Sequence, residues 1–281
     1  MSLSIKAVNR LGYIPDRPDH RDYKLSMIRP PVQLPVEPVN YIVKGFLEKF
    51  PVAYDQGNLG SCVANASGQE FCFVRKVAPR SRLQIYYESR RLENSINQDA
   101  GCYIRDAMKV LAQLGAGRET WWPYVEENFA VDPPLKVDRD ALLRRIMTYY
   151  RLESRADFRR CLLENFTFVC GITVYDYFVT EQAARFGIVP MPLQSERDIG
   201  GHAVLVIGYD DDFINSDWAK SAVAAGLPIH AIPKRVYIVR NSWGPKWGHQ
   251  GNFAIDASYI ESTDLCGDCW TQRPYEVKPN V

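Results

Sequence analysis

A single cysteine, Cys62, lies at the start of a predicted helix, where a thiol can act as a nucleophile. It closes residues 55–62, Asp-Gln-Gly-Asn-Leu-Gly-Ser-Cys, and a helical pattern of apolar residues follows. Backbone amides in a first helical turn lack intrahelical acceptors and form the positive end of the helix dipole, so they favour thiolate over thiol. The preceding glycine and serine indicate close approach of the backbone. We therefore predict that Cys62 is a nucleophile.

Two motifs far downstream supply candidate partners for this thiol. Residues 200–204, Gly-Gly-His-Ala-Val, contain His202, and residues 240–244, Arg-Asn-Ser-Trp-Gly, contain Asn241. An activated thiol needs a base, and none of the other histidines lies in a comparable motif. In papain and cathepsins the order is Cys, His, Asn, with the last two roughly 130–150 residues after the thiol. His202 falls within that window, and Asn241 lies beyond it.

These motifs resemble those of the papain-like cysteine peptidases, and further matches extend the resemblance. Gln56 stands six residues before Cys62, where papain-like enzymes keep a glutamine of the oxyanion hole. Residues 241–248, Asn-Ser-Trp-Gly-Pro-Lys-Trp-Gly, match the family's Asn-Ser-Trp-Gly-x-x-Trp-Gly block. Gly115 and residues 122–124, Trp-Pro-Tyr, resemble the family's passage from a helix end to a Tyr-Pro-Tyr turn. The matches run from about residue 34 to about residue 256, most of the chain.

Several departures indicate a divergent branch, bacterial rather than animal or plant. The family's Cys-Gly-Ser-Cys-Trp has Leu59 in place of the first cysteine and Val63 in place of the tryptophan. The disulfide that this first cysteine normally forms is therefore excluded. The family's substrate-pairing Gly-Gly loop corresponds to Gly101-Cys102, and the family's long pro-region is not recognisable in the sequence.

The resemblance implies how these residues would act. Cys62 attacks a peptide carbonyl as a thiolate, and a thioester acyl-enzyme forms. His202, held as an imidazolium, stabilises the thiolate and then protonates the departing amine. Asn241 orients the imidazole through its side-chain oxygen, while the Gln56 amide and the Cys62 backbone N–H bind the negative oxygen of the tetrahedral intermediate. Trp243 covers the His–Asn pair and lowers the local dielectric.

The same resemblance implies what lines the cleft and what enters it. Peptides or proteins are the expected substrates, and neither a cofactor nor a metal ion is expected. Substrate preference in this family depends chiefly on the pocket for the side chain two residues before the cut. The residues predicted to contact substrate are Ser61, Gly101, Cys102, Gly201 and Trp243.

The seven cysteines are scattered, which is not the pattern of a disulfide framework. Cys72, Cys161 and Cys170 lie in apolar stretches and are expected to be small core residues. Cys266 and Cys269 form a Cys-x-x-Cys motif, but no second such motif or suitably spaced histidine pair accompanies it. Because zinc sites use four ligands, a local disulfide or a buried thiol pair is expected instead.

Hydrophobic periodicity predicts helices in the first half of the chain. Apolar residues at helical spacing follow Cys62, and the pattern returns over residues 104–114, where Gly115 marks the end. A variant capping box, Ser154 with Asp157, begins a further helix.

Strand patterns predominate in the second half. Residues 166–174 alternate as strands do, and residues 203–207 and 236–239 are continuous apolar runs typical of strands buried on both faces. Helices followed by strands indicate an α+β fold. The resemblance implies a papain-like two-lobed fold, with a helical lobe, a β-barrel-like lobe and the active site in the groove between them.

The predicted domain organisation is an arm followed by one peptidase domain. Residues 1–33 are rich in proline and aperiodic, so we expect an extended arm, either a short pro-like segment over the cleft or a structural strap. Residues 34–281 form the domain, mainly helical over about 50–150 and mainly β over about 160–281. Residues 211–234 are expected to be an insertion with a small helix, most simply a surface decoration.

Bulk composition excludes several other classes of protein. The chain of 281 residues has 46% apolar and 24% charged residues, typical of a globular protein. Its net charge of +1 gives no reason to expect nucleic acid as a partner, and no apolar run is long enough for a membrane span. The N-terminus lacks the apolar core of a secretory signal, which leaves the compartment open. We expect a monomer.

Two alternatives remain open from the sequence. A transglutaminase-like or deamidating acyltransferase would share the cysteine and histidine, but such enzymes commonly use an aspartate as the third member. A non-catalytic binding module would share the fold, but degenerate members usually lose the nucleophile first. The intact set of Cys62, His202, Asn241 and Gln56 favours a cysteine endopeptidase over both.

Overall fold

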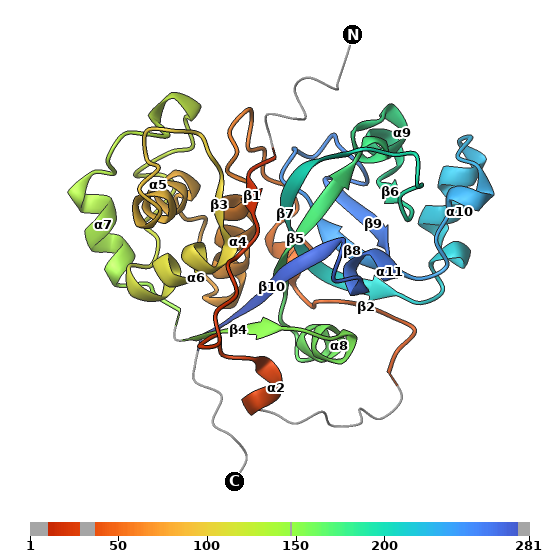
Figure 1. Ribbon diagram of the computed structural model, residues 1–281, viewed down its shortest axis with the longest axis horizontal. Coiled ribbons are helices and arrows are strands. Elements are labelled where there is room, and N and C mark those ends of the chain that lie inside the picture. Colours follow the sequence, from red (N-terminus) through yellow and green to blue (C-terminus); the bar gives the residue numbers. More distant parts are fainter. Residues whose placement is uncertain (1–10, 29–36, 147, 275–281) are drawn as a thin grey trace.

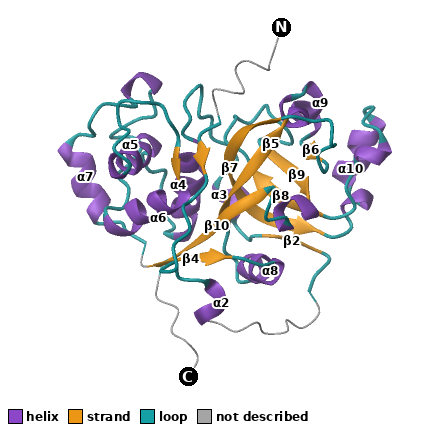
Figure 2. Cartoon of the chain, in the orientation of Figure 1, coloured by secondary structure: helices purple, strands orange, loops and turns teal. Residues whose placement is uncertain are grey.

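Helices and sheet occupy different sides of the molecule, and an N-terminal segment runs between them (Figure 1). The computed structural model describes residues 11–28, 37–146 and 148–274. Figure 2 shows α4 to α7 gathered on one side and the large sheet on the other. This is the α+β arrangement that the sequence predicts.

Most of the longer helices come before residue 165, and shorter ones decorate the sheet. The helices are α2 (Leu25–Ile28), α3 (Phe46–Lys49), α4 (Cys62–Val74), α5 (Arg82–Leu92), α6 (Ile104–Gln113), α7 (Leu135–Leu142), α8 (Arg155–Leu163), α9 (Glu181–Phe186), α10 (Asp217–Ala224) and α11 (Ala257–Glu261). The strands are β1 (Tyr13–Ile14), β2 (Asn40–Ile42), β3 (Cys102–Tyr103), β4 (Thr148–Leu152), β5 (Phe168–Tyr175), β6 (Ile188–Val189), β7 (Asp198–Asp210), β8 (Val236–Arg240), β9 (Asn252–Asp256) and β10 (Cys266–Arg273).

The large sheet is built around the long strand β7. Within the described residues its order is β4-β10-β5-β7-β8-β9-β6, and β2 also pairs with β7. Neighbours are antiparallel except for β6 and β9. The first part of β7 pairs with β5 and the last part with β8, so β7 carries residues from the lobe interface into the sheet.

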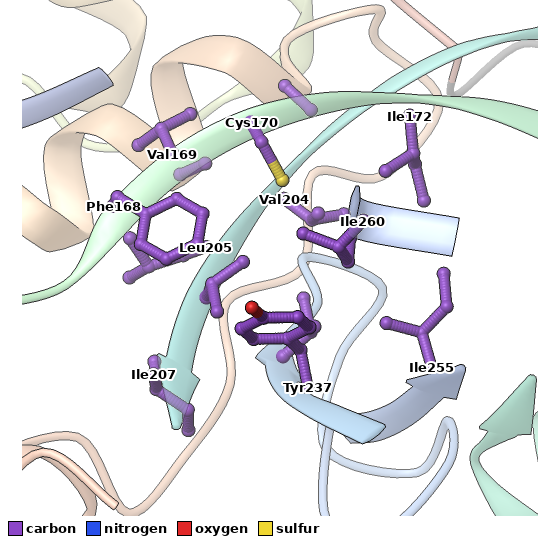
Figure 3. Close-up of a cluster of buried hydrophobic side chains, with 14 of the residues drawn as sticks. Phe168, Val169, Cys170, Ile172, Val204, Leu205, Ile207, Tyr237, Ile255 and Ile260 are labelled. Atoms are coloured by element: carbon purple, nitrogen blue, oxygen red, sulfur yellow. The ribbon is translucent and has the colours of Figure 1, made fainter. Parts of the chain in front are cut away.

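The sheet core explains why β5 is more buried than its alternating pattern predicts. Figure 3 shows Phe168, Cys170 and Ile172 of β5 in one cluster with side chains from β7, β8, β9 and α11. The opposite face of β5 is covered as well, since Val169 and Gly171 are also buried. A strand between two neighbours and two packed layers is buried on both faces, as β5 is over Phe168–Ile172.

The predicted helices form, and a charge-rich one was not foreseen. The helix after Cys62 is α4, and the pattern over residues 104–114 is α6. Ser154 caps α8 by accepting a hydrogen bond from the Asp157 backbone N–H at 3.2 Å. By contrast, α5 shows no clear apolar stripe, and tertiary contacts bury its polar residues.

The arm is more structured than an extended strap. Residues 11–28 contain β1 and the short helix α2, where Leu25 is buried; the rest of the predicted arm lies outside the described residues. The small helix expected within residues 211–234 is α10. None of the helices in the described ranges has the length and apolar character needed to cross a bilayer.

Candidate active site

Cys62 begins α4 and meets the sheet across the boundary between the two lobes. Its side chain is fully buried, and its Sγ accepts a hydrogen bond from the Ala203 backbone N–H of β7 at 3.4 Å. The thiol and the strand that carries His202 are thus adjacent, although 141 residues separate Cys62 from Ala203. The first turn of α4 supplies the positive helix end that the sequence predicts.

His202 of β7 and Asn241, the residue after β8, are hydrogen-bonded to each other. The distance from His202 Nε2 to Asn241 Oδ1 is 2.8 Å, and the Ser242 backbone N–H donates to the same oxygen at 2.8 Å. An atom that accepts from a backbone N–H is the amide oxygen, and an amide oxygen cannot donate. The geometry therefore assigns the proton to Nε2 and turns Nδ1 away from Asn241.

An aromatic cluster covers the His–Asn pair, as predicted for Trp243. The Trp243 ring lies 4.9 Å from the imidazole, centroid to centroid, and Trp243 is 6% exposed. Phe178 packs against Trp243 at 5.3 Å, and Trp247 stacks on Phe178 at 5.2 Å. Excluding water from this side strengthens the hydrogen bond between the ring and the amide.

Gln56 is hydrogen-bonded to Ser242, the residue that follows Asn241. Its Oε1 accepts from Ser242 Oγ at 2.5 Å, and its Nε2 donates to the Leu59 carbonyl at 2.8 Å. Its backbone N–H donates to the Ser242 carbonyl at 2.9 Å. These three hydrogen bonds fix both the backbone and the side-chain amide of Gln56.

Ser61 lies in a buried polar network rather than on the surface of the cleft. Its Oγ is 2.5 Å from Tyr124 Oη, and Asn65 Nδ2 donates to it at 3.0 Å. Tyr124 Oη in turn donates to the Gln56 carbonyl at 2.8 Å. The Trp-Pro-Tyr motif signalled this segment from the sequence, but the contact of Tyr124 with the glutamine loop was not foreseeable from spacing.

The N-terminal arm covers the thiol with a glycine. The Gly12 backbone amide lies close enough to the Cys62 sulfur to lower the pKa of the thiol, and the Gly12 carbonyl accepts from the Cys102 backbone N–H at 3.0 Å. A Cβ at Gly12 would overlap the Gly60 carbonyl, and one at Gly101 would overlap the Gly12 carbonyl. Only a residue without a side chain fits at Gly12, and the Gly101-Cys102 loop contacts this arm residue.

The next arm residue, Tyr13, fills a pocket made of glycines. Its ring lies against Gly171 of β5 and Gly201 of β7, where an added Cβ would overlap it. Its hydroxyl donates to Asp268 Oδ2 at 2.6 Å, close to Gly267. The predicted substrate residue Gly201 is therefore a wall of this pocket, while Asp268 and the other two glycines carried no motif that would reveal them.

Further along, ionic contacts fasten the arm to both lobes. Arg105 of α6 pairs with Asp22 through two N–H···O bonds of 2.9 and 2.7 Å. Arg151 of β4 binds Asp268 at 2.7 Å and Asp22 at 3.3 Å. Paired and partly buried contacts of this kind fix geometry more firmly than exposed ion pairs.

Burial also changes the titration of the thiol. It raises the pKa of Cys62 to about 11, and the backbone amides of Ala203 and Gly12 act in the opposite direction because they donate to the sulfur. In the covered structure the cysteine is held as a thiol at neutral pH. Displacing the arm would return water to the sulfur and lower this pKa.

Comparison with known proteins agrees with the fold. Residues 49–267 match the model of the papain family cysteine proteases, and the chain belongs to this family. An uncharacterized peptidase C1-like protein of Acanthamoeba polyphaga mimivirus is 31% identical over 285 residues, 92% of this chain and 85% of the relative. The chain is thus a cysteine peptidase with the two-lobed papain-like fold.

Solved structures show the same similarity. Xylellain, a cysteine protease from Xylella fastidiosa, has a TM-score of 0.75 and 30% identity, with 95% of this chain and 97% of xylellain covered. Procathepsin B S9 from Trypanosoma congolense has a TM-score of 0.65 and 17% identity, with 96% and 89% covered. The bacterial protein agrees with the expected divergent branch.

Replacing Gly12 by alanine should uncover Cys62. The new methyl group would collide with the Gly60 carbonyl, so the arm must leave the thiol. We expect alkylation of Cys62 by iodoacetamide at pH 7 to become at least about tenfold faster, because the pKa of Cys62 falls. Tyr23→Ala, at an arm residue that is 71% exposed, is the matched control and should react like the parent. Equal rates for Gly12→Ala and parent would show that the arm does not limit access.

Asp16 should make docking of the arm depend on pH. Burial raises the pKa of Asp16 to about 6, and the neighbouring Asp268 carboxylate is the next cause. Hydrogen bonds from Trp270 and Arg105 oppose the shift, and Arg151 Nη1 lies 3.8 Å away. A detached arm would expose Asp16, with a pKa near 4. The docked arm therefore binds the proton more tightly, so docking is strongest in acid and weakens between about pH 4 and 6.

Asp16→Asn should remove this dependence. An amide keeps an acceptor for Trp270 but never ionises, so the variant should stay docked at pH 7. We expect its Cys62 to react with 2,2′-dipyridyl disulfide at the parent's rate near pH 4 and up to about 100-fold more slowly at pH 7. The ratio of the two rates cancels the intrinsic pH dependence of the thiol. A ratio that stays constant over this range would contradict the assignment.

Proposed function

We propose that this chain is a cysteine endopeptidase with Cys62 as nucleophile, His202 as acid–base partner, Asn241 as orienting residue and Gln56 in the oxyanion hole. The observation that carries the proposal is the hydrogen bond from His202 Nε2 to Asn241 Oδ1. His202 lies on β7, and the next residue of this strand, Ala203, donates its backbone N–H to Cys62 Sγ. Fixing Nε2 as the donor leaves Nδ1 as the nitrogen that can take the thiol proton.

The reaction follows from these positions. His202 Nδ1 takes the proton of Cys62, and the thiolate forms a bond to the carbonyl carbon of the substrate. The negative oxygen is received by the Gln56 amide and the Cys62 backbone N–H. Collapse of this intermediate breaks the C–N bond, the imidazolium protonates the departing amine, and water then hydrolyses the thioester.

The arm is proposed to act as an inhibitor rather than as a substrate. The arm atom that faces the sulfur is the Gly12 N–H, a hydrogen-bond donor without an electrophilic carbon. The Gly12 carbonyl is occupied by the Cys102 backbone N–H. The one arm residue that contacts the sulfur within residues 11–28 thus offers a donor rather than a carbonyl to attack, so we assign the covered form to a zymogen.

The path of the arm supports internal cleavage of a polypeptide. Leu11, before Gly12, lies against Gly200, and Tyr13 and Ile14, after Gly12, pair with β3. The cleft therefore accommodates a chain that continues in both directions from Cys62. An enzyme restricted to chain ends would need one of these paths to be closed.

The proposed mechanism can be tested with a vinyl-sulfone inactivator of cysteine peptidases in the Gly12→Ala background. We expect one adduct, at Cys62, and cleavage within a peptide that is blocked at both ends. His202→Ala should slow both the formation of the adduct and the cleavage of the peptide by about 10²–10⁴-fold, because it removes the acid–base group. His249→Ala, in which a histidine stacked on Trp218 is lost, is the matched control and should retain both.

The outcomes separate the proposal from its alternatives. An adduct on another cysteine, or a Cys62→Ser variant as active as the parent, would refute Cys62 as nucleophile. Amide transfer or deamidation without peptide cleavage would favour an acyltransferase. Inertness of a folded, uncovered protein toward both inactivator and peptides would favour a binding module.

We propose further that the Tyr13 pocket selects substrates with a tyrosine two residues before the cut. Gly171 and Gly201 give the ring its space, and Asp268 accepts its hydroxyl. Asp268 is already paired with Arg151, which lowers its attraction for a basic side chain. A pocket built to hydrogen-bond a hydroxyl also discriminates against a ring without one.

Peptide series in the Gly12→Ala background can measure this preference. We expect kcat/KM to be at least about tenfold higher for tyrosine than for phenylalanine at that position. Gly171→Ala would fill the space of the ring and should lower kcat/KM for the tyrosine peptide by about 100-fold, with little effect on an alanine peptide. An equal loss for both peptides would mean that the pocket lies elsewhere.

A further inference from the structure

Three cysteines outside the active site bring their sulfur atoms together. Cys170 of β5 and Cys266 and Cys269 of β10 are all buried, and their Sγ atoms lie within 4.8 Å of one another. The Cys266 and Cys269 sulfurs are 3.9 Å apart. Figure 3 shows the sulfur of Cys170 directed from β5 into the core.

A β-bulge in β10 is what turns both of its cysteines to one face. Cys266 pairs with Ile172, Gly267 with Gly171, and Trp270 with Val169, so two residues of β10 stand opposite Cys170 alone. In a regular strand, residues three apart point to opposite faces. The extra residue of a bulge reverses that alternation and places Cys266 and Cys269 on the same face.

The extra residue is Asp268, which has a φ of 49°. Asp268 and Gly267 face the cleft, where they meet Tyr13, and the two cysteines beside them face the opposite way, toward Cys170. An aspartate in the left-handed region is uncommon. The bulge therefore places a carboxylate on one face of β10 and a pair of thiols on the other.

The sulfur spacing is that of thiolates sharing a metal ion. Two thiolates at about 2.3 Å from one ion, in tetrahedral geometry, are about 3.8 Å apart. A disulfide would need its sulfurs at about 2 Å. All sulfur–sulfur distances in the cluster are 4.8 Å or less, so a small side-chain adjustment is enough to bring them to about 3.8 Å. Sulfur donors select soft ions such as zinc or copper(I) over hard ones.

We propose that Cys170, Cys266 and Cys269 bind one thiophilic metal ion, Zn²⁺ or Cu⁺, through three thiolates. Each thiol releases its proton to solvent when it coordinates the ion. The sequence argument against zinc rested on the lack of further ligands near the Cys-x-x-Cys motif. The pairing of β10 with β5 supplies a third ligand, Cys170, from far away in the chain.

The ion has a path to this site from outside. A pocket of about 270 Å³ has Cys266 and Cys269 in its wall, and it is lined as well by Ser154, Glu153 and Glu261. The pocket also leaves room for a fourth ligand, which a zinc ion would take from water.

Metal binding can be measured on the full chain carrying Cys62→Ala, so that the catalytic thiol does not compete. The protein, reduced and without oxygen, is titrated separately with Co²⁺, Zn²⁺ and Cu⁺. We expect one ion per chain and a thiolate-to-cobalt charge-transfer band that Zn²⁺ abolishes. If copper(I) is the preferred ion, it should displace cobalt as well and outcompete zinc.

Matched variants test the three ligands. Cys170→Ala and the conservative Cys269→Ser should each weaken binding by more than about 100-fold, since even residues that only support ligands account for 10–100-fold. Cys72→Ala, at a buried cysteine of α4, should bind like the parent. Thermal unfolding of the metal-free proteins establishes that each variant is folded.

Three results would overturn the proposal. The first is the absence of a charge-transfer band in the folded parent. The second is equal binding by the parent and the folded Cys269→Ser variant, which would place the ion elsewhere. The third is a disulfide between any two of the three cysteines that persists in the protein under mild reductant, detected as a missing pair of reactive thiols after denaturation.

Discussion

The structure depends on one requirement: a thiol at a helix start and an imidazole on a strand must meet across the boundary between two lobes. The helix α4 supplies the dipole and the sulfur, and β7 supplies the ring. Because β7 also pairs with β5 and β8, the sheet fixes where His202 lies relative to Asn241. Neither lobe contains the proposed site alone, so the packing between the lobes is part of the chemistry.

The arm uses the same boundary. Gly12 takes the position over the sulfur, Tyr13 fills the neighbouring pocket, and ion pairs from Asp22 hold the segment to both lobes. In the proposed covered form, a backbone N–H next to the sulfur would block the site without offering a bond to cleave. The bulge at Asp268 links this surface to the sulfur cluster behind it, so one irregularity of β10 shapes two places.

Much of the fold could be predicted from local patterns. The helix after Cys62, the capped helix at Ser154 and the buried strands each follow from apolar spacing or from a cap, which are properties of neighbouring residues. The helix α5 could not, since polar and charged residues are buried in it alongside the apolar ones, and partners such as Glu119 and Asp138 lie far away in the chain. Its position is set by tertiary contacts that periodicity does not record.

The candidate site, like the fold, could be predicted from the sequence only in part. Cys62, His202, Asn241 and Gln56 each belong to a recognisable motif, and the structure brings their segments together, although their roles stay proposals.

The Tyr13 pocket and the third sulfur of the cysteine cluster were not foreseeable. Both depend on strand register, which places Gly171 and Cys170 of β5 on opposite faces beside β10. A one-residue change of register would exchange those faces. Register follows from the packing of the whole sheet, and no single motif carries it.

The central claim is that Asn241 fixes the His202 imidazole with its proton on Nε2. Nitrogen-15 NMR of the imidazole, assigned with His202→Gln, tests it most directly. We predict that Nε2 remains protonated at every pH at which the protein is folded and that Nδ1 alone titrates. A neutral ring that carries its proton on Nδ1, or that exchanges freely between the two forms, would contradict the account.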